Sequence, residues 1–188
     1  MSKLRSLFRT SSRIEVVDGI HLTSIDYPDA TLLAEKLNHV DFYQNTCSIP
    51  HPYTLADAQS FISGVIEYEK KNGIQRDWVV RNADGDLIGG IGLLYSHGLN
   101  AHRSEFGYWL AKEYWNQGIM TSVVKSFYQH IFFTTNLIRL EALVFAGNEG
   151  SCRVLEKAGF EKEGYLKKAY LKNGEFIDAT LFAIIKKD

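Results

Sequence analysis

Hydrophobic residues recur at helical spacing in several segments of the chain. In one segment Ile119, Val123 and Phe127 fall every fourth residue, so their side chains form a stripe along one face of a helix. Thr54 stands three residues before Asp57, a spacing typical of the first turn of a helix. The predicted helices cover Pro28 to Val40, Leu55 to Asn72, Gly118 to Thr134, and Asn148 to Ala158.

Runs of β-branched and aromatic residues between turn signals predict strands. The turn Asn82 to Gly85 and the dipeptide Asn173-Gly174 each predict a hairpin. Hydrophobic residues occupy alternate positions from Ile177 to Ile185, which predicts one covered face for the last strand. The predicted strands are Gly19 to Ile25, Gln75 to Arg81, Asp86 to Tyr95, Glu105 to Leu110, Arg139 to Phe145, Phe160 to Leu171, and Phe176 to Lys186.

The order of these elements predicts an α/β fold of the α+β kind. About four turns of predicted helix separate Glu105 to Leu110 from Arg139 to Phe145, which is enough for a right-handed crossover between parallel strands. The other neighbouring strands are expected to be antiparallel. We therefore expect a mixed, mostly antiparallel sheet of about seven strands with helices on both faces. Gly107 suits a locally distorted strand or a packing accommodation.

Composition and charge are those of an ordinary globular protein. Hydrophobic residues make up 45% and charged residues 23% of the 188 residues, enough for one domain with a substantial core. A formal net charge of −1 offers no basis for nucleic-acid binding. No apolar run reaches membrane-spanning length, so we expect a cytoplasmic protein with no membrane partner. Cys47 and Cys152 lack metal-ligand spacing, and no metal is expected.

The first eighteen residues differ in character from the rest of the chain. They contain basic residues without an extended hydrophobic stretch. We expect residues 1–18 to form an N-terminal extension, as a flexible or strand-adding tail, with a weak organelle-targeting segment as the alternative. Residues 19–188 are expected to form a single domain.

A predicted strand, a turn with a glycine, and a helix start follow one another from Glu105 to Thr121. The first amides of a helix have no partner within it and lie at the positive end of its dipole, so together they can bind a diphosphate. Alternatively, Gly118 only relieves crowding where the turn meets the sheet. The phosphate hypothesis assigns cofactor binding to Asn116, Gln117, Gly118, Ile119, Met120 and Thr121.

A second signature lies downstream, from Asn148 through Ser151 and Gly159-Phe160 to Gly164. With both segments in this order, the chain resembles the GNAT superfamily of acetyl-CoA-dependent N-acetyltransferases. It is most similar to the RimJ/RimL-type branch, which includes ribosomal-protein N-terminal acetyltransferases. The resemblance covers most of the chain, from near Gly19 to Asp178. It implies that the two parallel strands splay apart and leave a slot for the pantetheine arm of acetyl-CoA.

Two residues depart from the superfamily's cofactor motif, usually written Gln/Arg-x-x-Gly-x-Gly/Ala. Trp115 stands at its first position and Met120 at its last, so Gly118 is the only strict match. Backbone amides make most of the contacts in such a motif, and any residue except proline supplies one. The substitutions are therefore expected to alter packing more than phosphate affinity.

The resemblance assigns two polar residues to catalysis of acetyl transfer. Glu105 begins the strand beside the cofactor slot and is the candidate general base, with a solvated strand-end carboxylate as the alternative. Ser151 matches the serine that lies near the thioester sulfur in RimL-like relatives, where its hydroxyl can donate a proton or a hydrogen bond. Its alternative is a serine at a helix N-terminus that caps backbone amides.

Further positions are assigned to the two substrates. Asn148 resembles the asparagine that contacts the pantetheine or acetyl region, although a plain helix cap has the same sequence. Trp109 and Leu110 are expected to offer backbone groups to the pantetheine amides, as an added strand does. His51 and Tyr53 are expected to line one wall of the acceptor pocket, with a structural proline turn as the alternative.

The expected function is that of an acetyl-CoA-dependent N-acetyltransferase. Acetyl-CoA is the co-substrate, and the acetyl group passes directly to a primary amine on a protein or peptide N-terminus or on a small molecule. Related proteins often dimerise, so a homodimer is also expected. The alternative is a catalytically silent acyl-CoA-binding module that senses or scaffolds, which would need the Gly118 turn but neither Glu105 nor Ser151.

Overall fold

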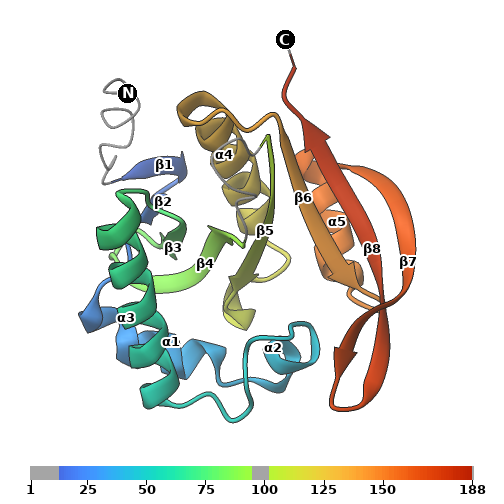
Figure 1. Ribbon diagram of the computed structural model, residues 1–188. Helices are drawn as coiled ribbons and strands as arrows, with labels where there is room; N and C mark the ends of the chain where they lie inside the picture. Colours follow the sequence, from blue (N-terminus) through green and yellow to red (C-terminus); the bar gives the residue numbers. More distant parts are fainter. Residues whose placement is uncertain (1–12, 95–101, 188) are drawn as a thin grey trace.

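The computed structural model describes residues 13–94 and 102–187, and these form a mixed sheet with helices on both faces (Figure 1). The strands are β1 (Ile14–Val17), β2 (Ile20–Thr23), β3 (Asp77–Arg81), β4 (Leu87–Leu93), β5 (Arg103–Leu110), β6 (Arg139–Phe145), β7 (Glu161–Lys172) and β8 (Glu175–Ile185). The helices are η1 (Tyr27–Asp29), α1 (Ala30–Leu37), α2 (Val40–Gln44), α3 (Leu55–Asn72), η2 (Lys112–Tyr114), α4 (Ile119–Thr134) and α5 (Glu149–Ala158).

The sheet has eight strands in the order β1-β2-β3-β4-β5-β6-β8-β7. Only β5 and β6 are parallel among the described pairs, as predicted, and both predicted hairpin turns join antiparallel neighbours. The strand that the sequence did not predict is β1, which pairs with β2 and lies inside the expected N-terminal extension. Ile14 and Val16 pack against the core, so this part of the extension adds to the sheet. Residues 1–12 of the extension and Tyr95 lie outside the described residues.

The predicted helix from Pro28 to Val40 was wrong as a single element. The structure has η1 and α1 there, followed by a separate helix α2. The backbone leaves helical geometry at Asn38, whose side-chain oxygen accepts the Tyr53 N–H at 3.1 Å. His39 is extended and caps the first turn of α2. The end of α1 thus coincides with a side-chain bond to a distant backbone amide, and periodicity along the chain carries no signal for such a contact.

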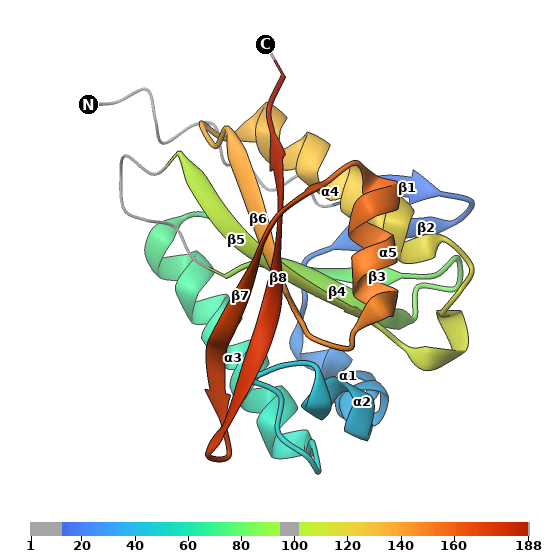
Figure 2. The same ribbon diagram turned by 90° about the vertical axis from the view of Figure 1, so that its right-hand side faces the viewer.

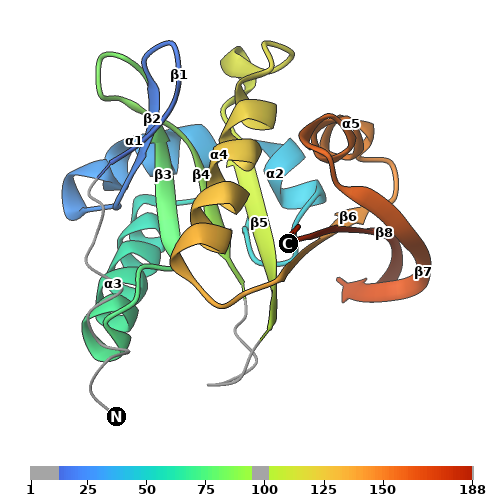
Figure 3. The same ribbon diagram turned by 90° about the horizontal axis from the view of Figure 1, so that it is seen from above.

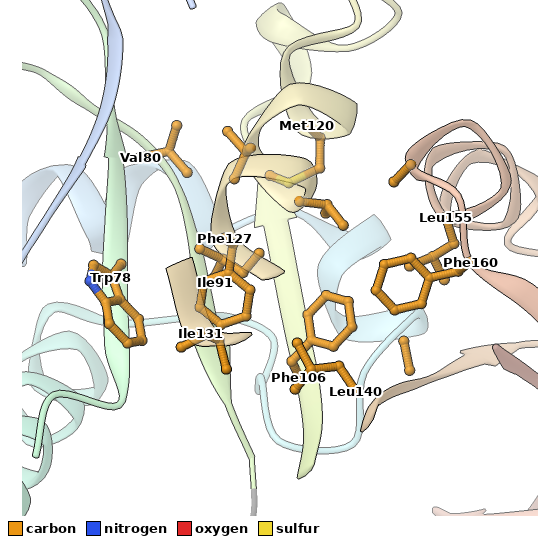
Figure 4. Packing of buried hydrophobic residues seen from close by; sticks show 14 of the residues in the cluster. Trp78, Val80, Ile91, Phe106, Met120, Phe127, Ile131, Leu140, Leu155 and Phe160 are labelled. Atoms are coloured by element: carbon orange, nitrogen blue, oxygen red, sulfur yellow. The ribbon is translucent and has the colours of Figure 1, made fainter. Parts of the chain in front are cut away.

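Two hydrophobic clusters cover opposite faces of the sheet, and Figure 2 shows the two groups of helices on its two sides. The larger cluster packs α4 and α5 against the sheet; Phe106, Phe127 and Leu155 are nearly or fully buried in it (Figure 4). The second packs α1 and α3 against β3, β4 and β5. Its described members include no residue of β6, β7 or β8, so these helices leave that part of the sheet face uncovered.

The last strand differs from its prediction of one covered face. Phe182 lies on the same face of β8 as Asp178, yet it is 1% exposed and belongs to the cluster beneath α5. Ala183, in the opposite alternation, is also buried, whereas Ile185 is 52% exposed. The centre of β8 is therefore buried on both faces, because α5 covers the face that the polar residues had marked as exposed.

β5 and β6 pair over three positions only, from Arg103 opposite Arg139 to Glu105 opposite Glu141. Both strands continue beyond this point without pairing with each other, and Figures 1 and 3 show β6 leaving β5 to run with β8 and β7. The predicted splay of the parallel pair is confirmed. Past Glu105, the edge of β5 that faces β6 has no strand partner, which leaves a gap in the sheet.

Candidate functional site

The N-terminus of α4 is built around a glycine in the left-handed conformation. Gly118 has φ 78° and no described side chain caps the helix start, so the amides of Ile119, Met120 and Thr121 lack an intrahelical acceptor. A Cβ placed on Gly118 would meet no atom within 4 Å. The glycine therefore serves the backbone conformation rather than close packing, which removes the alternative that it relieves crowding.

Side chains hold the loop that precedes α4. The indole Nε1 of Trp115 donates to the Leu110 carbonyl oxygen at 2.6 Å, and the Gln117 amide donates to the Glu113 carbonyl oxygen at 2.8 Å. Asn116 also has a positive φ, of 59°. Trp115, which departs from the superfamily motif, thus ties the loop to the end of β5 and directs the chain into α4.

Backbone orientation along β5 decides which residues face the gap. Hydrogen bonds to β4 involve Glu105 and Ala111, and in an antiparallel pair the hydrogen-bonded residues alternate. The backbone groups of Tyr108 and Leu110 therefore point toward the gap, and those of Trp109 point toward β4. Tyr108, rather than Trp109, has the orientation that the predicted pantetheine contact requires. At Leu110 the carbonyl already accepts the indole of Trp115, which leaves its N–H.

Ser151 lies in the first turn of α5 and contacts β5. The hydroxyl oxygens of Ser151 and Tyr108 are 2.6 Å apart, and Tyr108 Oη is 3.2 Å from the Ser151 carbonyl oxygen. The Ser151 N–H donates to Asn148 Oδ1 at 3.1 Å, so Asn148 is the helix cap that the sequence left open as an alternative. Ser151 itself does not act as that cap. Its hydroxyl instead contacts Tyr108 in β5, the strand that borders the gap.

Glu105 lies on the opposite face of the sheet from Ser151. Side chains alternate along β5, with Phe106 in the α4/α5 cluster and Trp109 packed against the α1/α3 cluster, and Glu105 shares the face of Trp109. Two polar groups therefore approach the same gap from its two faces. Ser151 approaches with α5, and Glu105 approaches from the face on which α1 and α3 pack.

Burial and a neighbouring carboxylate raise the pKa of Glu105. Desolvation is the larger cause, the charge of Glu141 adds to it, and a hydrogen bond from Tyr170 opposes both. Glu141 is itself paired with Arg103 and Arg139. A half-buried carboxylate with a raised pKa is suited to accept a proton.

The predicted acceptor residues occupy different environments. Tyr53 is 7% exposed in the α1/α3 cluster, and burial, followed by the charge of Asp57, raises its pKa to about 12. Tyr53 is therefore a core residue, and its ring is not exposed as the structural alternative had expected. His51 is exposed, with its ring centroid 6.2 Å from that of Tyr43 in α2. Lys172 of the β7–β8 hairpin donates to the carbonyls of Tyr43 and Thr46, which brings the hairpin against the α2 segment.

Tyr108 is a candidate that sequence reasoning missed. It alternates with Phe106 and Leu110 on the core-facing side of β5, and its hydroxyl is a polar group in that row, as is that of Ser104. A buried tyrosine normally finds a hydrogen-bond partner, so the hydroxyl was a signal for a contact across the core, although its partner on α5 was not readable.

Residues 13–94 and 102–187 contain neither a metal-binding cluster nor a membrane-spanning helix. They contain no group of three or more His, Cys, Asp or Glu side chains arranged to hold a metal ion. No helix within these ranges has both the length and the apolar character needed to cross a membrane.

Comparison with known proteins identifies the family. A family model described as an acetyltransferase (GNAT) domain matches residues 20–161. The chain is 35% identical over 120 residues to the uncharacterized N-acetyltransferase YoaA of Bacillus subtilis, which covers 63% of this chain and 66% of that protein, slightly less than two thirds of its length.

Two solved structures share the fold. The ribosomal-protein-S5-alanine acetyltransferase of Vibrio fischeri superposes with a TM-score of 0.80 at 26% identity, covering 94% of this chain and 97% of that chain. The microcin C7 self-immunity acetyltransferase MccE, solved with acetyl-CoA and AMP, has a TM-score of 0.82 at 21% identity, covering 94% and 97%. Since the family model spans more than half of the residues, the chain belongs to the GNAT acetyltransferase family.

Proposed function

We propose that this protein transfers the acetyl group of acetyl-CoA directly to a primary amine. The observation that carries the proposal is the left-handed Gly118, which opens a row of amides without intrahelical acceptors beside the gap between β5 and β6. Amides at Ile119, Met120 and Thr121 would hold the diphosphate. The exposed edge of β5 at Tyr108 and Leu110 would hold the pantetheine arm as an added strand does.

The two faces of the gap supply the chemistry. As the amine nitrogen bonds to the acetyl carbon, the carbon–sulfur bond breaks and the amine loses a proton. Glu105 would receive that proton, directly or through water, from the face opposite Ser151. The Ser151 hydroxyl would donate a hydrogen bond to the leaving sulfur from the α5 face. Attack and departure then take place on opposite sides of the transferred group, and no covalent enzyme intermediate is needed.

The ionisation of the amine favours an N-terminal acceptor. An α-amine with a pKa of about 8 is roughly one-tenth neutral at pH 7, whereas a lysine side chain with a pKa of about 10.4 is neutral in only about one molecule in 2,000. A half-buried carboxylate is a sufficient base for the first. The similar structures include a ribosomal-protein-S5-alanine acetyltransferase, so we propose a protein or peptide N-terminus before a small amine. A cytoplasmic homodimer belongs to the same proposal.

Thiol release provides the direct test of this function. Purified protein is expected to release free coenzyme A thiol from acetyl-CoA when it is offered an amine from a panel of N-terminal peptides, aminoglycosides, polyamines and amino sugars. Peptides are expected to give the highest kcat/KM. Binding of acetyl-CoA by calorimetry without release in any reaction would instead support a silent acyl-CoA-binding module. Absence of both would contradict the proposal.

The pH dependence tests Glu105 separately. If Glu105 is the base, kcat/KM for an α-amine requires both the neutral amine and ionised Glu105. Its logarithm should rise with slope 1 below the amine pKa of about 8, and with slope 2 below the pKa of Glu105, which lies above the ordinary value. Activity is therefore lost as pH falls through the raised pKa. Glu105→Gln should show slope 1 at every pH below the pKa of the amine. If slope 2 persists in that variant, a group other than Glu105 is responsible for the second ionisation.

A further inference from the structure

The hydroxyl groups of Tyr108 and Ser151 form a short polar contact between β5 and α5, and Ser151 is one of the residues assigned to the reaction. Their oxygens are 2.6 Å apart. Tyr108 is partly buried, and its ring packs against the core cluster at 6.0 Å from the ring centroid of Phe106. The ring position is therefore set by packing, which makes its hydroxyl a rigid reference point for the flexible side chain of Ser151.

The available hydrogens restrict how these groups can bond. Each hydroxyl has one hydrogen, and Tyr108 Oη has two acceptors within reach, Ser151 Oγ at 2.6 Å and the Ser151 carbonyl oxygen at 3.2 Å. When Tyr108 donates to the nearer oxygen, the Ser151 hydrogen is not used in the pair. It can then point away from Tyr108, toward a third group. When Ser151 instead donates to Tyr108, the Tyr108 hydrogen can bond the Ser151 carbonyl oxygen, and the Ser151 hydrogen is no longer available to a substrate.

We propose that Tyr108 is a positioning residue that donates its hydrogen to Ser151 Oγ and thereby directs the Ser151 hydrogen toward the leaving sulfur of acetyl-CoA. The inference rests on the proposed function and extends it by one residue. Tyr108 touches Ser151 and acts through it. No proton leaves Tyr108: the sulfur departs as a thiolate that accepts a hydrogen bond from Ser151 and is protonated by solvent after release.

The environment of Tyr108 fits a permanent donor. Burial raises its pKa, and the hydrogen bond with Ser151 lowers it by a smaller amount, so the balance is a pKa above the ordinary value. The phenol therefore keeps its proton through the neutral range, in which an α-amine substrate becomes reactive. A donor that does not titrate holds Ser151 in one orientation at every working pH.

Steady-state kinetics with Tyr108→Phe tests the proposal. The variant keeps the ring that packs in the core and removes the donor. Its kcat with a saturating amine is expected to fall about five- to thirtyfold, the effect of one lost orienting hydrogen bond, with an unchanged dissociation constant for acetyl-CoA. Tyr128→Phe is the matched control, because it removes a hydroxyl from another aromatic ring that packs on the same cluster. Its kcat should equal that of the wild type.

A double-mutant cycle separates positioning from a purely structural tie between β5 and α5. If Tyr108 acts through Ser151, adding Tyr108→Phe to Ser151→Ala should lower kcat by less than about twofold further. A full additional five- to thirtyfold loss would overturn the inference, as would an unchanged or raised kcat in the single variant. If the wild type releases no thiol with any amine, the proposed function falls as well. If the wild type turns over and Tyr108→Phe matches it, only the role of Tyr108 is lost.

Discussion

Replacing Gly118 with glutamate is expected to weaken the binding of acetyl-CoA by on the order of a hundredfold and to lower thiol release with it. The residue stands directly before the amides assigned to the diphosphate, and a side chain on it would enter space where no protein atom lies within 4 Å of the Cβ. Two like charges about 5 Å apart, at an effective dielectric constant of about 20, repel by roughly 3 kcal/mol. That energy corresponds to a loss of affinity on the order of a hundredfold.

The matched control is Gly118→Gln, which has the same shape and the same backbone strain but no charge. The positive φ of 78° makes any side chain here unfavourable by about 1 kcal/mol, and this penalty is common to both variants. Calorimetric titration with acetyl-CoA should therefore show the glutamate variant binding about a hundredfold more weakly than the glutamine variant. This difference in affinity should become smaller at high salt. Equal affinities in both variants and the wild type would contradict a diphosphate at this helix start.

Ser151→Ala is expected to lower kcat by about ten- to a thousandfold while leaving the affinity for acetyl-CoA nearly unchanged. The hydroxyl is assigned to the sulfur as negative charge develops on it, so its removal acts on the transition state more than on the bound ground state. The start of α5 should persist, because the Asn148 cap bonds the backbone N–H of Ser151 rather than its side chain. Single-turnover thiol release and calorimetry together measure the two effects.

Ser126→Ala is the control for this substitution, since it removes a partly buried serine hydroxyl from the neighbouring helix α4. Its kcat should match that of the wild type. Equal turnover in Ser151→Ala would remove Ser151 from the mechanism and the Tyr108 inference with it. A parallel rise in the dissociation constant of acetyl-CoA would instead assign the hydroxyl to ground-state binding.

Much of the fold follows from local pattern. The long helices α3 and α4, the hairpins at Asn82 to Gly85 and Asn173-Gly174, and the parallel pair β5 and β6 all have signals within a few residues of themselves. A capping residue, a turn dipeptide or an amphipathic stripe acts through residues that are close in the chain. Such interactions can therefore be recognised from the sequence alone. The errors arose where a distant contact decided the outcome, as at Asn38, which bonds the Tyr53 amide.

The sequence by itself determined which groups this protein contains: a glycine and backbone amides at the start of a helix, a carboxylate near the start of a strand, and a serine in the first turn of another helix. Only the tertiary structure decided how these groups are arranged. It turned the backbone of Tyr108 rather than that of Trp109 toward the gap, placed Glu105 and Ser151 on opposite faces, and joined Ser151 to Tyr108. The physical reason is that strand phase and helix docking depend on packing between segments far apart in the chain, whereas residue type and spacing are local.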